Sequence, residues 1–450
     1  MLRSSCKSIA LKLNNLKFCL PAALLMSAIL AGCSTEERIS RNVKKVFTRS
    51  PVLKQYYAGF ALYDLEAQRM LFERYGDQYF TPASNTKLFT FFAGLKMIPD
   101  SIPSLRYIER GDSLIFWGTG DPSFLQSKLK GTKAADFLRS SDKKLFYAPG
   151  RYTGDFYGSG WQWDDYNDYY QAEINELPIM DNLADVRVND GKLVVVPGNF
   201  SDCFVADSLS NQKTFRVKRD FGSNNFKYPI MPVPANYSQQ IPYKVDLAVT
   251  LSLLSDTLNK PVEVVQLKMP ADAKTIYNLK TDSVLKEMML PSDNFIAEQL
   301  LLVYANQLGG ELNAGKAIAY IQKNYLSELP DKPEWVDGSG LSRYNLFTPR
   351  DMVKLLEMIY KTVNNPKRLF GMMPAGGMSG TLRNAYPKTN DPFVFAKTGT
   401  LSGVHNQSGY VLTKKGKTFI FSFMNNNFVT STSEVRKEMV RIMTHIHENF

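Results

Sequence analysis

Residues 80–97 read FTPASNTKLFTFFAGLKM, and this stretch decides the class of fold. After Thr81 and Pro82 the apolar positions lie mainly on one helical face, which predicts a helix that begins at about Ser84. Lys87 follows Ser84 by three residues, and side chains three apart on a helix are neighbours. The stretch therefore predicts a serine hydroxyl beside a lysine amine at the start of a helix.

Segments near both ends of the chain have the pattern of β-strands. Apolar and aromatic residues predict strands at 56–64, 69–73, 393–400, 407–413 and 418–424. Helical patterns lie between them, and one begins at Thr348-Pro349, because threonine is a good N-cap and proline suits the first helical position. The expected fold class is α+β, with a catalytic domain made of an antiparallel sheet and helices.

A long middle segment differs in composition from both flanks. It is rich in strand and turn signals, and tyrosine and tryptophan crowd the stretch from Tyr152 to Tyr170. We predict that residues 103–265 form an inserted β-rich domain or domains. Residues 55–102 and 266–450 would then form one discontinuous catalytic domain.

Three short motifs occur in order along the chain, and each alone is weak evidence. Ser-x-x-Lys, for example, also occurs at 140–143 and 283–286. For each motif, only one copy falls in the context that the chemistry requires. That context is a helix start for Ser-x-x-Lys, a turn between helices for Ser-x-Asn and a late edge strand for Lys-Thr-Gly. These copies are Ser84-Asn85-Thr86-Lys87, Ser292-Asp293-Asn294 and Lys397-Thr398-Gly399. Together they match the motif set of penicillin-recognising serine enzymes.

The residue types suit nucleophilic catalysis. Ser84 is a poor nucleophile unless a nearby base takes its proton. Lys87 can be that base only when it is neutral, and burial together with the positive charge of Lys397 would lower its pKa. We expect Ser292 to relay a proton between Lys87 and the leaving amine. Asn294 would hold Lys87 and the substrate amide in place.

The third motif suits the end of a peptide. Lys397 and Thr398 on a strand edge can receive a free C-terminal carboxylate through charge-assisted hydrogen bonds. The backbone N–H groups of Ser84 and Thr400 would stabilise the oxyanion that forms during attack. These assignments favour a carboxypeptidase.

Histidine-based and metal-based mechanisms have weaker support. The chain has only three histidines, so a Ser-His-Asp site would have to use the turn at His405 or the last helix. His445 and His447 have the spacing of one strand face, but they lie in a segment that reads as helix. We therefore expect no metal and no cofactor.

Further segments extend the motif set over nearly the whole mature chain: 118–122, 160–165, 337–343 and 380–382. With them, the sequence resembles the D-alanyl-D-alanine carboxypeptidase/endopeptidase family of class C low-molecular-mass penicillin-binding proteins. The resemblance implies a penicillin-binding, serine β-lactamase-like fold with an insertion between the first two motifs. It also implies acylation of Ser84, peptidoglycan stem peptides as substrates and β-lactams as inhibitors.

Two other functions remain open on the sequence. A serine β-lactamase shares all three motifs, but class A enzymes also need a carboxylate that activates water, and the nearest similar text, residues 255–259, lacks the glutamate. A non-catalytic wall-binding lipoprotein would tolerate losses among the motif residues, and none is missing.

The N-terminus reads as an export signal. Basic residues precede an apolar run from Phe18 to Leu30, and Leu30-Ala31-Gly32-Cys33 resembles the lipobox of bacterial lipoproteins. We predict a signal peptide over residues 1–32, a lipidated Cys33 and a basic tether over 33–54 beside anionic headgroups. The protein would then be anchored to a bacterial membrane, facing the periplasm or cell wall. Export argues against nucleic acid as a partner, despite a net charge of +11.

Overall fold

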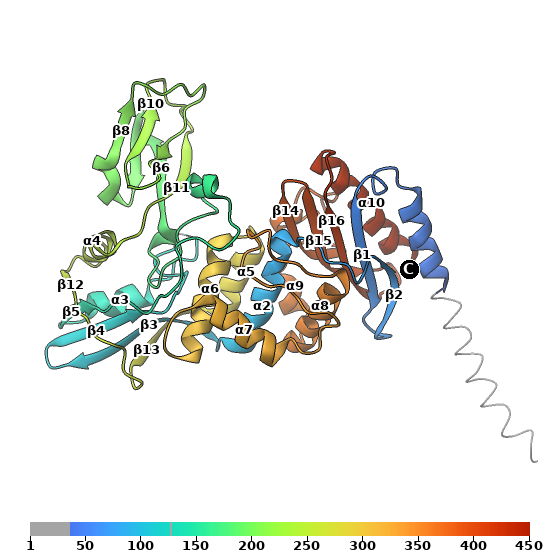
Figure 1. Ribbon diagram of the computed structural model, residues 1–450, viewed down its shortest axis with the longest axis horizontal. Coiled ribbons are helices and arrows are strands. Elements are labelled where there is room, and N and C mark those ends of the chain that lie inside the picture. Colours follow the sequence, from blue (N-terminus) through green and yellow to red (C-terminus); the bar gives the residue numbers. More distant parts are fainter. Residues whose placement is uncertain (1–36, 127) are drawn as a thin grey trace, which may run out of the picture.

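The computed structural model describes residues 37–126 and 128–450. The predicted signal peptide and Cys33 lie outside the described residues. The expected α+β fold class is confirmed: a body of helices and one sheet carries a second lobe that projects from it (Figure 1). None of the helices within the described ranges is both long enough and apolar enough to cross a membrane.

One antiparallel sheet is built from both ends of the described chain. Its strand order is β14-β15-β16-β1-β2, so the C-terminal strands pair with the N-terminal hairpin and β14 lies at an edge. The strands are β1 (Tyr57–Asp64), β2 (Arg69–Arg74), β14 (Val394–Leu401), β15 (Val404–Leu412) and β16 (Thr418–Asn426).

Helices cover both faces of this sheet, because successive side chains of a strand point to opposite faces. In β1, Phe60 and Leu62 pack towards α10 (Thr432–Asn449), whereas Ala61 packs towards the larger helical layer. That layer and its surroundings contain α2 (Lys87–Met97), α5 (Thr281–Met289), α6 (Asn294–Leu308), α7 (Ala314–Tyr325), α8 (Pro349–Val363) and α9 (Pro366–Gly371). The sheet is thus the middle of three layers.

A helix over residues 37–49 differs from the predicted tether. Ile39, Val43 and Phe47 repeat every four residues and are buried with α10 against the sheet. The ring centroids of Phe47 and Phe60 are 4.8 Å apart. The prediction of a tether is therefore wrong for this part of the chain, because the abundant basic residues obscured an amphipathic pattern.

The second lobe is larger than the predicted insertion. Strand β13 pairs antiparallel with β3, so the lobe's first sheet begins at Ser101 and ends at Lys280 rather than at 103 and 265. The order of this sheet is β12-β5-β4-β3-β13, and two three-stranded sheets follow the orders β11-β6-β7 and β8-β10-β9. Their strands are β3 (Ser101–Arg110), β4 (Ser113–Gly118), β5 (Lys144–Tyr147), β6 (Leu183–Asn189), β7 (Lys192–Val196), β8 (Phe204–Asp207), β9 (Lys218–Arg219), β10 (Phe226–Pro229), β11 (Ser238–Pro242), β12 (Val262–Val264) and β13 (Lys274–Lys280).

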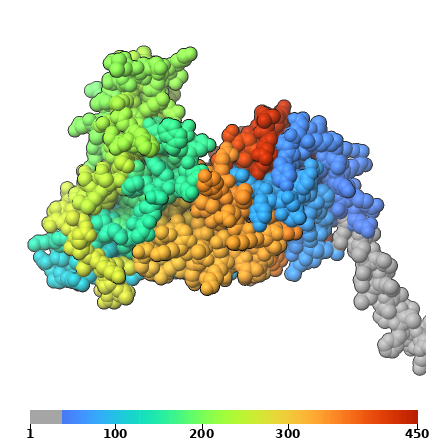
Figure 2. Space-filling view, in the orientation of Figure 1, coloured from blue at the N-terminus to red at the C-terminus, as the bar shows by residue number. Residues whose placement is uncertain are grey.

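The lobe has its own apolar core. Helices α3 (Lys133–Ser140) and α4 (Leu247–Leu258) pack there with the strands. The two small sheets stand away from the body that holds the five-stranded sheet of β1 and β14 (Figure 1). The space-filling view shows an open recess between the green part of the lobe and the red and blue parts of the body (Figure 2). The insertion therefore forms one wall of a wide recess.

Candidate active site

The turn that carries Ser84 is shaped by the backbone around it. The 3₁₀ turn η1 (Ala83–Thr86) leads directly into α2, so the α-helix begins at Lys87, slightly later than predicted. A Cβ atom on Gly340 would lie 1.9 Å from the carbonyl oxygen of Ala83, and one on Gly399 would lie 2.8 Å from the backbone nitrogen of Ser84. Only glycine allows such close approach. The turn is thus held between the 337–343 loop and β14.

Lys87 joins two of the predicted motifs. Its Nζ is 2.9 Å from Ser84 Oγ, 2.6 Å from Asn294 Oδ1 and 2.7 Å from the carbonyl oxygen of Ser339. The two carbonyl-type oxygens can only accept hydrogen bonds. A neutral amine has two N–H groups and one lone pair, so it can donate to both oxygens and accept from the Ser84 hydroxyl. The geometry therefore suits a general base.

Burial favours this neutral form. The Lys87 side chain is fully buried, which lowers its pKa to about 8, although the nearby carboxylates of Glu298, Asp337 and Asp293 oppose the shift. Burial also lowers the pKa of Lys397 well below its usual range, and the charge of Lys87 adds to that effect. Burial therefore disfavours a proton on either lysine, and a proton on Lys87 disfavours one on Lys397.

Glu298 is a site residue that the sequence analysis missed. Its buried carboxylate accepts hydrogen bonds from the backbone nitrogens of Gly338 (3.0 Å) and Ser339 (2.7 Å). These bonds fix the loop that presents the Ser339 carbonyl oxygen to Lys87. The sequence contained a signal for this role, namely a glutamate within a largely apolar helix. A carboxylate buried in such a helix needs hydrogen-bond partners.

Asp337 holds the same loop from within. It accepts from the backbone nitrogens of Gly340 (2.8 Å) and Ser342 (2.7 Å), and burial raises its pKa. Sequence analysis marked residues 337–343 only by resemblance and assigned them no chemistry. The structure brings the loop into direct contact with Lys87.

The second and third motifs meet at Ser292. This residue has a φ of 67° in the turn between α5 and α6, as the sequence predicts for its position. Lys397 Nζ donates to Ser292 Oγ at 2.7 Å and to the Thr398 carbonyl oxygen at 2.6 Å. No hydrogen bond joins Ser292 to Lys87 among the described residues. The direct relay expected between these two residues is therefore absent from this state of the site, where Ser292 pairs with Lys397.

The remaining predicted residues lie on the edge strand. Thr398 Oγ1 donates to Thr381 Oγ1 at 2.7 Å, and Thr400 Oγ1 lies 2.8 Å from His405 Nδ1. Thr398 is half-buried and Thr400 is exposed. Because β14 is an edge strand, one of its sides has no neighbouring strand in the sheet, and a peptide can approach it from that side.

The inserted lobe also reaches the site. Asn294 Nδ2 donates to the backbone carbonyl oxygen of Tyr170 at 3.1 Å. Sequence analysis missed this contact, because a backbone acceptor leaves no mark on side-chain patterns. The hydrogen bond to Tyr170 fixes the side-chain amide of Asn294 so that its Oδ1 faces Lys87.

The hydrogen bonds of the histidines in the described part of the chain do not reach Ser84 or Lys87. His405 contacts Thr400, burial lowers its pKa to about 4, and His447 Nδ1 lies 2.6 Å from the Leu412 carbonyl oxygen. No group of three or more metal-ligating side chains occurs in residues 37–126 and 128–450. The group that contacts the Ser84 hydroxyl is thus a lysine.

Comparison with known proteins identifies the family. The sequence profile of the D-Ala-D-Ala carboxypeptidase 3 (S13) family matches residues 39–446. "D-alanyl-D-alanine carboxypeptidase DacB" of Haemophilus influenzae is 25% identical, and the match covers 84% of this chain and 86% of that protein. "Penicillin-sensitive carboxypeptidase A" of Dictyostelium discoideum is 26% identical, with 92% and 89% covered.

A solved structure shares the fold. The crystal structure of penicillin binding protein 4 (dacB) from Haemophilus influenzae superposes with a TM-score of 0.69 at 20% identity, over 90% of this chain and 99% of that one. The profile match spans nearly all of the described residues, including all three motifs. The chain therefore belongs to the D-Ala-D-Ala carboxypeptidase 3 (S13) family and is a serine-type hydrolase.

Proposed function

We propose that this protein is a D-Ala-D-Ala carboxypeptidase that also acts as an endopeptidase on D-Ala-D-X cross-links of peptidoglycan, through an acyl-enzyme on Ser84. The observation that carries the proposal is the hydrogen bond between Ser84 Oγ and a buried Lys87 whose other two partners are acceptors. Incubation with defined muropeptides, followed by mass analysis of the products, tests it. Release of terminal D-Ala together with cleavage of the D-Ala-D-X cross-links is expected, and intact cross-links would remove the endopeptidase part of the proposal.

Acylation would begin with proton transfer from the Ser84 hydroxyl to neutral Lys87. Ser84 Oγ then attacks the carbonyl carbon of the penultimate D-Ala, and the backbone N–H groups of Ser84 and Thr400 stabilise the oxyanion. The close packing of Gly399 on the Ser84 backbone nitrogen supports this pairing. As the C–N bond breaks, the leaving amine takes a proton, with Ser292 as the relay. Water then hydrolyses the ester and restores Ser84.

Binding of the substrate carboxylate would set the protonation of both lysines. Lys397 has a lowered pKa in the free protein, and an opposite charge next to it favours its protonated form. Protonated Lys397 would in turn disfavour a proton on Lys87. The carboxylate would therefore help to make Lys87 the base, while Thr398 and Thr381 offer hydroxyl groups beside it.

Lys397→Ala is expected to weaken kcat/KM mainly for substrates with a free terminal carboxylate. The expected loss of transition-state stabilisation is about 2–5 kcal/mol, because the variant leaves the desolvated carboxylate of the substrate without the Lys397 ammonium group. Paired steady-state assays on one peptide with a free or an amidated terminus measure the effect. An equal loss on both peptides would exclude Lys397 as the group that recognises the carboxylate.

We also propose that the chain is exported and lipid-anchored through Cys33. The helix over residues 37–49 packs into the catalytic body, so the body would lie within about 15 Å of the anchor, the reach of four extended residues. The enzyme would work close to the membrane surface, on the wall-facing side.

Cys33→Ala is expected to release the protein from membranes or to stall its processing. A lipid on Cys33 with further acyl chains exceeds the two signals that stable anchoring needs. Membrane fractionation and the intact mass of the N-terminal peptide measure this. Soluble wild-type protein without lipid would show that the proposed anchor is wrong, while replacement of Cys203, a half-buried free cysteine, serves as the control.

A further inference from the structure

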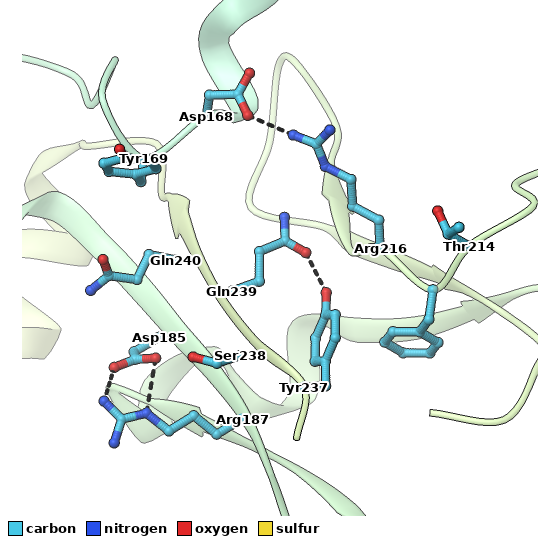
Figure 3. A pocket seen from close by; sticks show the side chains of 11 residues that line it. Asp168, Tyr169, Asp185, Arg187, Thr214, Arg216, Tyr237, Ser238, Gln239 and Gln240 are labelled. Carbon is cyan, nitrogen blue, oxygen red and sulfur yellow. Dashed lines mark hydrogen bonds and ion pairs between the residues drawn. The ribbon is translucent and has the colours of Figure 1, made fainter. Parts of the chain in front are cut away.

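A polar pocket in the inserted lobe has one wall next to the segment that contacts Asn294. Its volume is about 570 Å³, and its walls come from Asp168, Tyr169, residues 214–216 and the strands β6 and β11 (Figure 3). Tyr169 directly precedes Tyr170, whose carbonyl oxygen holds the Asn294 amide. The proposed reaction uses none of the side chains that line this pocket. One wall of the pocket thus adjoins the segment that holds Asn294, and its side chains are free for another role.

The charges of the pocket are paired within it. Asp168 lies 2.6 Å from Arg216, and Asp185 forms an ion pair with Arg187 (Figure 3). A charged ligand would have to compete with these partners. A neutral ligand that both donates and accepts can instead bind the unused lone pairs and N–H groups of each pair. The pocket therefore favours an uncharged polar ligand.

An exposed ring and an amide complete the pocket. The side chain of Tyr169 is 61% exposed, and Figure 3 shows it on the same side as Gln240. Gln240 lies opposite Asp185 in the β6–β11 register, so its amide stands beside the Asp185–Arg187 pair. An exposed aromatic face suits the apolar C–H face of a sugar ring, and an amide can pair with hydroxyl and N-acetyl groups.

We infer that this pocket binds the glycan strand of the substrate polymer, as neutral N-acetylated sugars. The inference rests on the proposed function, since the D-Ala-D-Ala end of a stem peptide is joined to a sugar through a few residues. A peptide of five residues spans at most about 17 Å, so a sugar at its far end can reach the wall that Tyr169 forms, next to Tyr170 and its contact with Asn294. Holding the glycan raises the effective concentration of the peptide at Ser84.

A binding assay separates this inference from catalysis. Ser84→Ala protein is titrated by calorimetry with a hexamer of β-1,4-linked N-acetylglucosamine. Saturable binding is expected, and adding Tyr169→Ala or Gln240→Ala should weaken it at least tenfold. Tyr277→Ala is the matched control, because Tyr277 is 47% exposed on β13 and does not line the pocket. It should leave the affinity unchanged.

Activity assays give the second test. With Ser84 intact, Gln240→Ala should lower kcat/KM for a disaccharide-linked pentapeptide and leave that for the sugar-free pentapeptide unchanged. Absence of hexamer binding, or equal binding by the Tyr169 and Gln240 variants, would overturn the inference. An equal loss on both pentapeptides would also overturn it, since the pocket would then be a peptide subsite. A failure of the proposed function would appear separately, as a lack of penicillin adduct on wild-type protein.

Discussion

Ser84→Ala is expected to abolish the covalent adduct with benzylpenicillin and to cut turnover of D-Ala-D-Ala peptides by about 10⁶-fold, the scale seen when a serine nucleophile is lost. A β-lactam presents a strained amide beside a carboxylate and so mimics the acyl-D-Ala-D-Ala bond. Its opened ring keeps the leaving amine tethered, which slows deacylation. Intact-mass analysis after exposure to the drug, followed by peptide mapping, detects the adduct.

The chain contains a matched control for this prediction. Ser140 and Lys143 form another Ser-x-x-Lys sequence, at the exposed end of α3. Ser140→Ala should leave both the adduct and the turnover unchanged, because the motif there has no buried lysine. An adduct on any residue other than Ser84, or none on folded wild-type protein, would contradict the assignment.

Lys87→Ala is expected to slow acylation by about 10²–10⁴-fold, the usual worth of general-base assistance. The variant also removes the donor to Asn294 and to the Ser339 carbonyl oxygen, so some loss of stability is expected. The acylation rate is measured by stopped-flow with a chromogenic β-lactam, and the melting temperature is measured beside it. The Lys143→Ala variant is the matched control.

The pH profile distinguishes the base from a structural lysine. Lys87 acts only when deprotonated, and burial lowers its pKa to about 8. For a peptide with an amidated terminus, whose binding does not need protonated Lys397, the wild-type kcat/KM should therefore rise tenfold per pH unit below about pH 8 and level off above it. Lys87→Ala should lose this limb while remaining folded. A variant that keeps the same limb would show that another group is the base.

Local sequence determined the pairing of Ser84 with Lys87 and most of the elements around it. Ser84 and Lys87 are close because one helical turn separates them, and strand or cap signals are read over a few residues. The strands of the sheet and the helix that begins at Pro349 lie where the patterns predict, with small shifts at their ends. These features need no knowledge of distant parts of the chain.

Tertiary structure alone decided what surrounds that pair. Glu298, the Ser339 carbonyl oxygen and the Tyr170 carbonyl oxygen reach the site from segments far apart in sequence, two of them through backbone atoms. The helix over 37–49 and strand β13 took their places because each buries apolar or backbone groups against a distant partner. Such pairings depend on which surfaces meet when the whole chain packs, and a local pattern does not encode this.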